Sequence, residues 1–211
     1  MVIGAEFPVG GAIALALAEA GADVAVAALQ PDESVLTSRK VKRAIEAMGR
    51  RSAEYVMDVM LGRNVQVTTR QIAKAMGGLD LVVSAGELPL AVAIDKISET
   101  DLARVVAMNF SAHLFVLRSA AGEFARNEPH EGSRGAITIV TPNHEGQPGL
   151  AAVASAQAGA RQLVPEAAAE FAEARVRVNG IVADVAALDA VRDAALELAS
   201  SAVNGEIRDV R

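Results

Sequence analysis

Two short stretches of the sequence hold residue types that can do chemistry. In the first, Gly4 and Gly10 lie in a turn between a short apolar run and an alanine-rich segment. A turn of this kind points the N-terminus of a helix at an anion, because free N–H groups and the helix dipole favour negative charge there. In the second, His144 is followed directly by Glu145, and an imidazole beside a carboxylate can act as an acid–base pair. The alternative for this pair is a hydrated turn without chemistry.

The chain holds no residue pattern typical of a metal site. Its three histidines, His113, His130 and His144, are widely separated, and it has no cysteine. Zinc sites need closely spaced ligands, and a disulfide framework needs cysteine. We therefore expect neither a bound metal ion nor a disulfide.

The composition indicates a globular protein that does not bind nucleic acid. The chain has 211 residues, a net charge of −6 and 52 % hydrophobic residues. Its length fits one domain, which we expect to span residues 1–211, and its negative charge lacks the basic footprint of a nucleic-acid-binding protein. No uncharged apolar run reaches about 18 residues and no basic segment precedes the first apolar stretch, so neither a membrane span nor a signal peptide is expected. We expect a cytoplasmic location.

Apolar strands alternate with helices along the whole chain. After a short strand at residues 2–3, strands are expected at residues 23–29, 53–57, 79–83, 135–141, 175–182 and 205–210. The helices expected between them span residues 12–20, 35–48, 64–76, 101–126, 150–173 and 189–200. Ser98 and Asp101 form a capping box at the start of the fourth helix. This alternation is typical of an α/β fold, a doubly wound parallel sheet with helices on both faces.

Several landmarks resemble, in order and spacing, those of the short-chain dehydrogenase/reductase family. They are the turn at residues 3–10, Asp58, the segment Val83-Ser84-Ala85-Gly86, Asn109, residues 148–152 and the segment Arg177-Val178-Asn179. The resemblance covers nearly the whole chain and implies a Rossmann fold of this family's type. It also implies a site for NAD(P), with Gly4, Gly10, Asp58, Ala85 and Gly86 at the cofactor-binding positions. For Asp58 the alternative is that it caps the following turn.

The residues at the family's catalytic positions do not match its chemistry. The family uses a tyrosine and, four residues later on the same helix, a lysine, and these positions hold Val153 and Gln157. The position of the catalytic serine falls on Thr141 or Pro142, while Asn109 matches the family's asparagine in the middle of a helix. Valine has no proton to donate and glutamine has no charge that could lower a neighbour's pKa. The family's mechanism cannot run on these residues.

No other tyrosine or lysine can take over these two roles. The only tyrosine, Tyr55, lies in the third predicted strand, and no lysine follows Lys96. We therefore expect Asn109 to keep only a structural task, which is to hydrogen-bond within a helix irregularity.

The cofactor positions depart from the family pattern as well. Pro8 replaces the central glycine of the turn, and proline has no N–H group for a phosphate. The second strand ends in Ala28, Leu29 and Gln30, which offer neither an acid for a free ribose nor a base for a 2′-phosphate. Asp189 already begins the last helix, so the segment that covers the substrate in relatives is nearly absent. Both ends of the domain are also expected to be short.

Two classes of function follow from these departures. The first is a catalytically inactive family member that acts as a structural or regulatory subunit, with itself or with an active relative. The alternative is an NAD(P)-dependent oxidoreductase for a carbonyl or alcohol substrate that uses His144 and Glu145. A third reading, a nucleotide-sensing regulator, requires binding without turnover.

The two longest predicted helices are candidates for a subunit interface. The helices at residues 101–126 and 150–173 are rich in alanine and weakly charged along one side. In relatives, this pair forms a four-helix bundle with the same pair of a second subunit, and small residues let the helices approach closely. The resemblance therefore implies a homo- or hetero-oligomer. The alternative is that these faces only cover the chain's own sheet.

Overall fold

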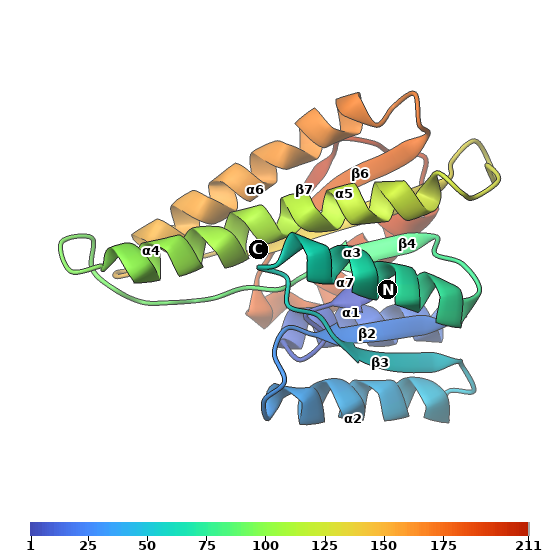
Figure 1. Cartoon of the computed structure of the whole chain (residues 1–211), viewed down its shortest axis with the longest axis horizontal. Coiled ribbons are helices and arrows are strands. Elements are labelled where there is room, and N and C mark those ends of the chain that lie inside the picture. The colour runs from blue at the N-terminus through green and yellow to red at the C-terminus, as the bar shows by residue number, and fades with distance from the viewer. Residues whose placement is uncertain (211) are drawn as a thin grey trace.

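The computed structural model describes residues 1–210, which form one parallel β-sheet between two layers of helices (Figure 1). The strands are β1 (Val2–Ile3), β2 (Val24–Ala28), β3 (Ser52–Val56), β4 (Leu81–Ser84), β5 (Gly135–Pro142), β6 (Val176–Ala183) and β7 (Ile207–Val210). The α-helices are α1 (Pro8–Glu19), α2 (Ser34–Ala47), α3 (Gly62–Met76), α4 (Glu99–Val106), α5 (Ala112–Phe124), α6 (Ala151–Glu170) and α7 (Leu188–Ser200). The doubly wound α/β fold predicted from the sequence is confirmed.

The sheet order creates a crevice next to the first turn. The strands follow one another as β3-β2-β1-β4-β5-β6-β7, and every pair is parallel. The direction of winding therefore reverses between β1 and β4. In open α/β sheets, ligands bind at such a reversal, outside the carboxyl ends of the strands. The turn after β1 lies at this place.

Each face of the sheet buries its own hydrophobic core. One core gathers residues of α1, α2 and α7, including Ile13, Ile45 and Leu198, and the other gathers residues of α3, α5 and α6, including Ile72, Phe124 and Val164. Apolar side chains on both faces explain why the central strands read as continuous hydrophobic runs.

The first helix begins one turn earlier than the sequence predicted. We expected it at residue 12, but α1 starts at Pro8, which occupies the first helical position. Proline suits this position because its missing N–H has no partner within a helix, and its fixed φ matches the helix. Gly10 therefore belongs to the helix rather than to the turn.

The long helix expected at residues 101–126 is interrupted by one π-helical turn, η1 (Ala107–Ser111), between α4 and α5. Ser98 caps its start, since its Oγ accepts a hydrogen bond from the Asp101 N–H at 3.1 Å, as the capping box predicted. The combined helix Glu99–Phe124 is long and apolar enough to cross a membrane by length and composition, but half of that window is buried inside the protein. It packs beside α6 (Figure 1).

Candidate functional site

A cavity of about 300 Å³ opens at the carboxyl ends of β1, β4, β5 and β6. The first turn of α1, with Pro8 and Val9, forms one wall, and the segment after β5, with Asn143 and His144, forms another. Glu87 from the segment after β4 also lines the cavity. Parallel strands bring these segments to the same edge of the sheet, although they are far apart in the sequence.

The glycines of the first turn are required by packing. Gly4 has φ +83°, and a Cβ added there would lie 2.8 Å from the carbonyl carbon of Ala85 and from the amide nitrogen of Gly86. A Cβ at Gly10 would lie 2.2 Å from the Gly4 carbonyl oxygen. The structure thus brings four of the five predicted cofactor-binding residues together, and it explains both turn glycines without any ligand.

Glu6 connects this turn to the end of β2. Its Oε1 accepts a hydrogen bond of 2.7 Å from the Leu29 N–H. Its other carboxylate oxygen is buried and has no partner within the described part of the chain. Burial raises the pKa of this carboxyl above its ordinary value, the hydrogen bond from Leu29 opposes that shift, and the nearby charge of Asp32 adds to it.

Asp58, the fifth predicted cofactor-binding residue, lies apart from the other four, after β3. Its carboxylate accepts a hydrogen bond of 3.0 Å from the Met60 N–H, and its own N–H donates to Asn64 Oδ1 at 2.9 Å. These contacts are those expected if Asp58 caps the turn before α3. Contact with an adenine ring stays a prediction.

The positions expected to hold the catalytic tyrosine and lysine lie in the protein interior. Val153 is 0 % exposed and packs with Val105 and Leu150, and Leu88 covers the same cluster. Gln157, one turn further along α6, is 2 % exposed, and neither atom of its amide has a partner among residues 1–210. Thr141 on β5 is equally buried, with an unpaired hydroxyl. No side chain at these positions faces a solvent-filled space.

Asn109 has the structural role that the sequence predicted for it. Its amide group bonds both backbone groups of Leu88, each at 3.1 Å, and donates to the Val105 carbonyl at 3.0 Å. In an α-helix that carbonyl would accept the backbone N–H of Asn109 itself. Because the side chain takes its place, the helix widens into the π-turn η1.

The predicted pair of His144 with Glu145 is wrong. His144 Nε2 lies 2.9 Å from Glu87 Oε2, while Glu145 Oε1 lies 3.3 Å from Arg161. Consecutive residues in this turn point in different directions, whereas the turns after the paired strands β4 and β5 meet. The contact with Glu87 was missed because the two residues are 57 positions apart. The parallel pairing of their strands was the only available signal.

The connection from β6 to the last helix is short, as predicted. Asp184 is followed by the 3₁₀ turn η2 (Val185–Ala187), and α7 begins at Leu188. The Asp184 carboxylate accepts a hydrogen bond of 2.8 Å from the Ala186 N–H. This carboxylate caps the turn, and Asp184 also lines the cavity at the carboxyl ends of the strands.

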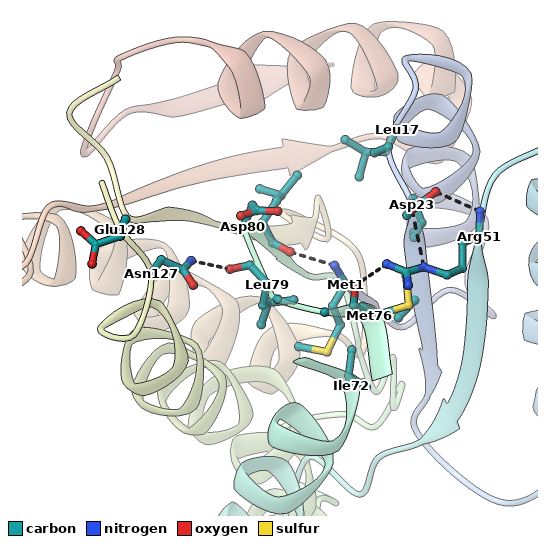
Figure 2. Close-up of a pocket in the computed structure, with 16 residues that line it drawn as sticks. Met1, Leu17, Asp23, Arg51, Ile72, Met76, Leu79, Asp80, Asn127 and Glu128 are labelled. Atoms are coloured by element: carbon teal, nitrogen blue, oxygen red, sulfur yellow. Dashed lines mark hydrogen bonds and ion pairs between the residues drawn. The ribbon is translucent and has the colours of Figure 1, made fainter. Parts of the chain in front are cut away.

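A second cavity, of about 520 Å³, lies at the opposite edge of the sheet, near the first residues of β2 and β4 (Figure 2). Its polar groups bind one another: the Met1 amine donates to the Leu81 carbonyl at 2.8 Å, and Arg51 bonds the Met76 carbonyl and pairs with Asp23. Because ligands in such sheets bind at the carboxyl ends of the strands, we do not assign the site to this cavity.

The remaining histidines do not build a metal site. His113 is buried beneath the sheet, 2.9 Å from the hydroxyl of Ser84, and burial lowers its pKa to about 4. In the part of the chain that the structure describes, no three His, Asp or Glu side chains are grouped so that they could hold a metal ion.

Comparison with known proteins places the chain in a family. The family model described as short chain dehydrogenase matches residues 1–196. A short-chain dehydrogenase/reductase of Armillaria gallica is 30 % identical over 179 residues, which cover 85 % of this chain and 67 % of that protein. The chain belongs to the short-chain dehydrogenase/reductase family. It spans about two thirds of the length of the curated relatives that it matches, between 63 % and 67 %.

Solved structures of other dehydrogenases superpose closely on this chain. A short-chain type dehydrogenase/reductase from Mycobacterium marinum superposes with a TM-score of 0.88 at 21 % identity, covering 99 % of this chain and 91 % of its own. A xylitol dehydrogenase solved with bound NAD⁺ gives a TM-score of 0.84 at 20 % identity, covering 99 % of this chain and 95 % of its own. At these identities the likeness shows the fold.

The crevice of this short-chain dehydrogenase/reductase does not fit the dinucleotide of its family at three residues. Pro8 lacks the N–H that a pyrophosphate would use. The Leu29 side chain lies against Gly86, where an added Cβ would be 2.7 Å from Leu29 Cδ1, and Glu6 occupies the Leu29 N–H. Leu29 and Glu6 thus add bulk and charge near the places where the fold holds a ribose and a pyrophosphate, and Pro8 removes a donor.

Proposed function

We propose that this short-chain dehydrogenase/reductase homologue is catalytically inactive and acts as a structural or regulatory subunit. The observation that carries the proposal is the burial of Val153, which is 0 % exposed in a cluster with Val105 and Leu150. The position that holds the proton donor in the family is part of the hydrophobic core here. Proton transfer to a substrate requires a titratable group that reaches the substrate, and valine supplies none.

The neighbouring residues support the same proposal. Gln157 stands where the family has a lysine, and its buried amide carries no charge to hold a ribose or to tune a neighbour. The segment after β4 lies over this region, since Leu88 is held by Asn109 and the Val92 N–H donates to the Gly149 carbonyl at 2.8 Å. A substrate would have to displace this segment to reach Val153.

The direct test is an assay of the purified chain with NADH and NADPH against a panel of aldehydes and ketones. We expect no turnover above that of a buffer blank, and any trace activity should be unchanged in Val153→Ala. Activity that co-purifies with the chain through every step and is lost in a variant of the crevice would contradict the proposal.

For a subunit role, we propose that α4, α5 and α6 form the contact with a second subunit. Large apolar side chains on α4 and α5 stay exposed, with Leu102 at 43 %, Val106 at 39 % and Leu114 at 40 %. They recur on one side of the long helix beside α6, at spacings of one and two turns. An apolar stripe of this kind favours association with a similar helix pair.

The association is tested by light scattering coupled to size exclusion. Leu102→Arg combined with Leu114→Arg should shift an oligomer to the monomer mass, whereas Leu36→Arg, which changes an exposed leucine of α2, should not. An unchanged mass in the double variant would refute this interface. Co-purification from the native host then asks whether the partner is a second copy or an active relative.

One observation favours a second candidate function, an oxidoreductase with a displaced acid–base pair. His144 and Glu87 lie 2.9 Å apart in the wall of the cavity, and a carboxylate that orients an imidazole is a common proton-transfer arrangement. Against it, Nε2 is used by Glu87, and Nδ1 is buried without a partner among the described residues. This candidate requires turnover that His144→Gln abolishes, and the same assay measures it.

A further inference from the structure

We propose that Glu6 and Pro8 close the crevice to dinucleotides and that replacing both residues reopens it. This inference concerns binding and stands apart from the proposal on catalysis, because an inactive homologue can still bind a nucleotide. It assigns a selectivity role to two residues at the turn between β1 and α1.

The Glu6 carboxylate lies where the fold binds the ribose of a dinucleotide. It bridges from the turn after β1 to the N–H at the end of β2, 2.7 Å away. In dinucleotide-binding sheets, an acid at the end of the second strand binds the hydroxyl groups of the adenosine ribose. Here a carboxylate from the turn lies at that place and uses the backbone N–H of Leu29. Its second oxygen is buried, so a ribose cannot reach it without moving the side chain.

The negative charge of Glu6 also opposes the binding of a pyrophosphate. The pyrophosphate of a dinucleotide is anionic, and in this fold it lies at the N-terminus of the first helix. Glu6 is placed two residues before that helix, and Asp32 is close enough to raise its pKa. Like charges repel strongly where solvent is partly excluded. The first turn of α1 also has one N–H fewer than a helix that begins with glycine, because its first residue is Pro8.

Apolar side chains take up part of the crevice. Leu29 is 4 % exposed and contacts Gly86 across the end of β1. Phe7 packs against the core cluster on the side of the sheet that includes Leu29. The open cavity of about 300 Å³ is lined by Phe7 and Pro8 but by neither Glu6, Leu29 nor Asp58. This cavity therefore lies beside His144, and at the end of β2 the Leu29 side chain takes up the space against Gly86.

The test is a gain of binding. Glu6→Ser and Pro8→Gly, alone and together, are titrated with NADH and NADPH by cofactor fluorescence and calorimetry. Glu6→Gln removes the charge but keeps an oxygen that can accept from Leu29, so it separates charge from shape. Glu33→Ser is the matched control, because it removes a nearby exposed charge and leaves the Leu29 contact intact. Thermal unfolding confirms that each variant is folded.

We expect the wild type and Glu33→Ser to show no saturable binding at millimolar NADH. The double variant should bind NADH at least on the order of tenfold more tightly than the wild type, because it regains one charge-assisted hydrogen bond to the pyrophosphate. Glu6→Gln should lie between them. Micromolar binding by the wild type, or a folded double variant that still does not bind, would overturn the inference. Turnover with any substrate would instead refute the proposed function, so the two failures are distinguishable.

Discussion

At the scale of single residues, buried polar side chains of this protein serve the fold. His113 lies beneath the sheet against Ser84, and Asn109 ties the segment after β4 to a helix. Gly4 and Gly10 are positions where any side chain would strike the backbone. Such residues look functional in a sequence because their types are those of active sites. Their surroundings give each of them a role in packing or hydrogen bonding within the fold.

His113 should make the protein sensitive to acid. Burial lowers its pKa to about 4, whereas in the unfolded chain it titrates near 6.5. Between these values the unfolded state binds a proton that the folded state does not, so stability is lost as the pH falls from about 6.5 to 4. Denaturant unfolding at pH 7 and 4.5 should show a pH-dependent loss that is about 2–3 kcal/mol smaller in His113→Gln than in the wild type. His130→Gln, at an exposed site, is the control, and an equal loss in all three proteins would contradict the assignment.

Gly10 should be needed for stability in the absence of any ligand. An alanine Cβ would lie 2.2 Å from the Gly4 carbonyl oxygen, so Gly10→Ala should lower the free energy of unfolding by about 2–4 kcal/mol. The matched control is Gly122→Ala in α5, where nothing lies within 4 Å and helix propensity should raise stability by about 0.5–1 kcal/mol. Urea unfolding measures both changes. Equal changes in the two variants would show that the close approach of Gly10 to Gly4 does not control stability.

At the scale of elements, the segment between β4 and α4 covers the positions where the family carries out catalysis. The Asn109 side chain holds this segment at Leu88, and the Gly149 carbonyl holds it at Val92. Leu88 and Leu90 then pack against the apolar cluster that contains Val153. The π-turn is the local consequence, because the helix widens where the Asn109 amide takes over the Val105 carbonyl.

Removing this attachment should destabilise the fold. Asn109→Ala leaves both backbone groups of Leu88 and the Val105 carbonyl without their partner, and unpaired buried groups of this kind lower stability by about 2–4 kcal/mol in sum. Asn143→Ala removes a side-chain bond in an exposed turn and should change stability by less than about 1 kcal/mol. Hydrogen exchange at Leu88 should quicken in the first variant only. Unchanged exchange would argue against the attachment.

At the scale of the whole molecule, the chain keeps the fold of the family, although Val153 and Gln157 stand at the positions of its catalytic pair. All seven strands and the two helical layers match structures of dehydrogenases, including one solved with NAD⁺. Val153 and Gln157 are buried in α6, whereas Pro8 lines the cavity at the carboxyl ends of the strands. The hydrophobic cores on the two faces of the sheet can hold this fold without the catalytic pair.

Reinstating the family's catalytic pair should therefore fail to restore activity. Val153→Tyr with Gln157→Lys forces a larger side chain and a charge into positions that are at most 2 % exposed. Overpacking and an unpaired buried ammonium should together lower stability by at least about 3 kcal/mol, without NADPH-dependent reduction of aldehydes. Ala47→Lys places the same charge on an exposed position of α2, outside the proposed subunit contact, and should be tolerated. A stable, active double variant would show that the segment after β4 opens readily.

Most of the fold could be predicted because its determinants are local. The alternation of apolar strands with helices and the cap at Ser98 depend on neighbours in the sequence, and so does the short connection before α7. The element boundaries were less predictable: α1 starts at Pro8 and α6 ends at Glu170, since end positions depend on how a helix packs. The partner of His144 could not be predicted either, because the sheet places Glu87 beside it from 57 residues away.

By itself the sequence determined what this protein lacks, since the absence of a tyrosine and a lysine after residue 96 needs no coordinates. Its motifs also resembled those of the family, and the match of the family model over residues 1–196 confirms that resemblance. Only the tertiary structure decided what the residues at the family's catalytic and cofactor-binding positions do in this chain. Val153 became core, Glu6 reached the Leu29 N–H, and the glycines of the first turn were needed for backbone contact. These outcomes depend on contacts between strand ends that are adjacent in the sheet and distant in the chain.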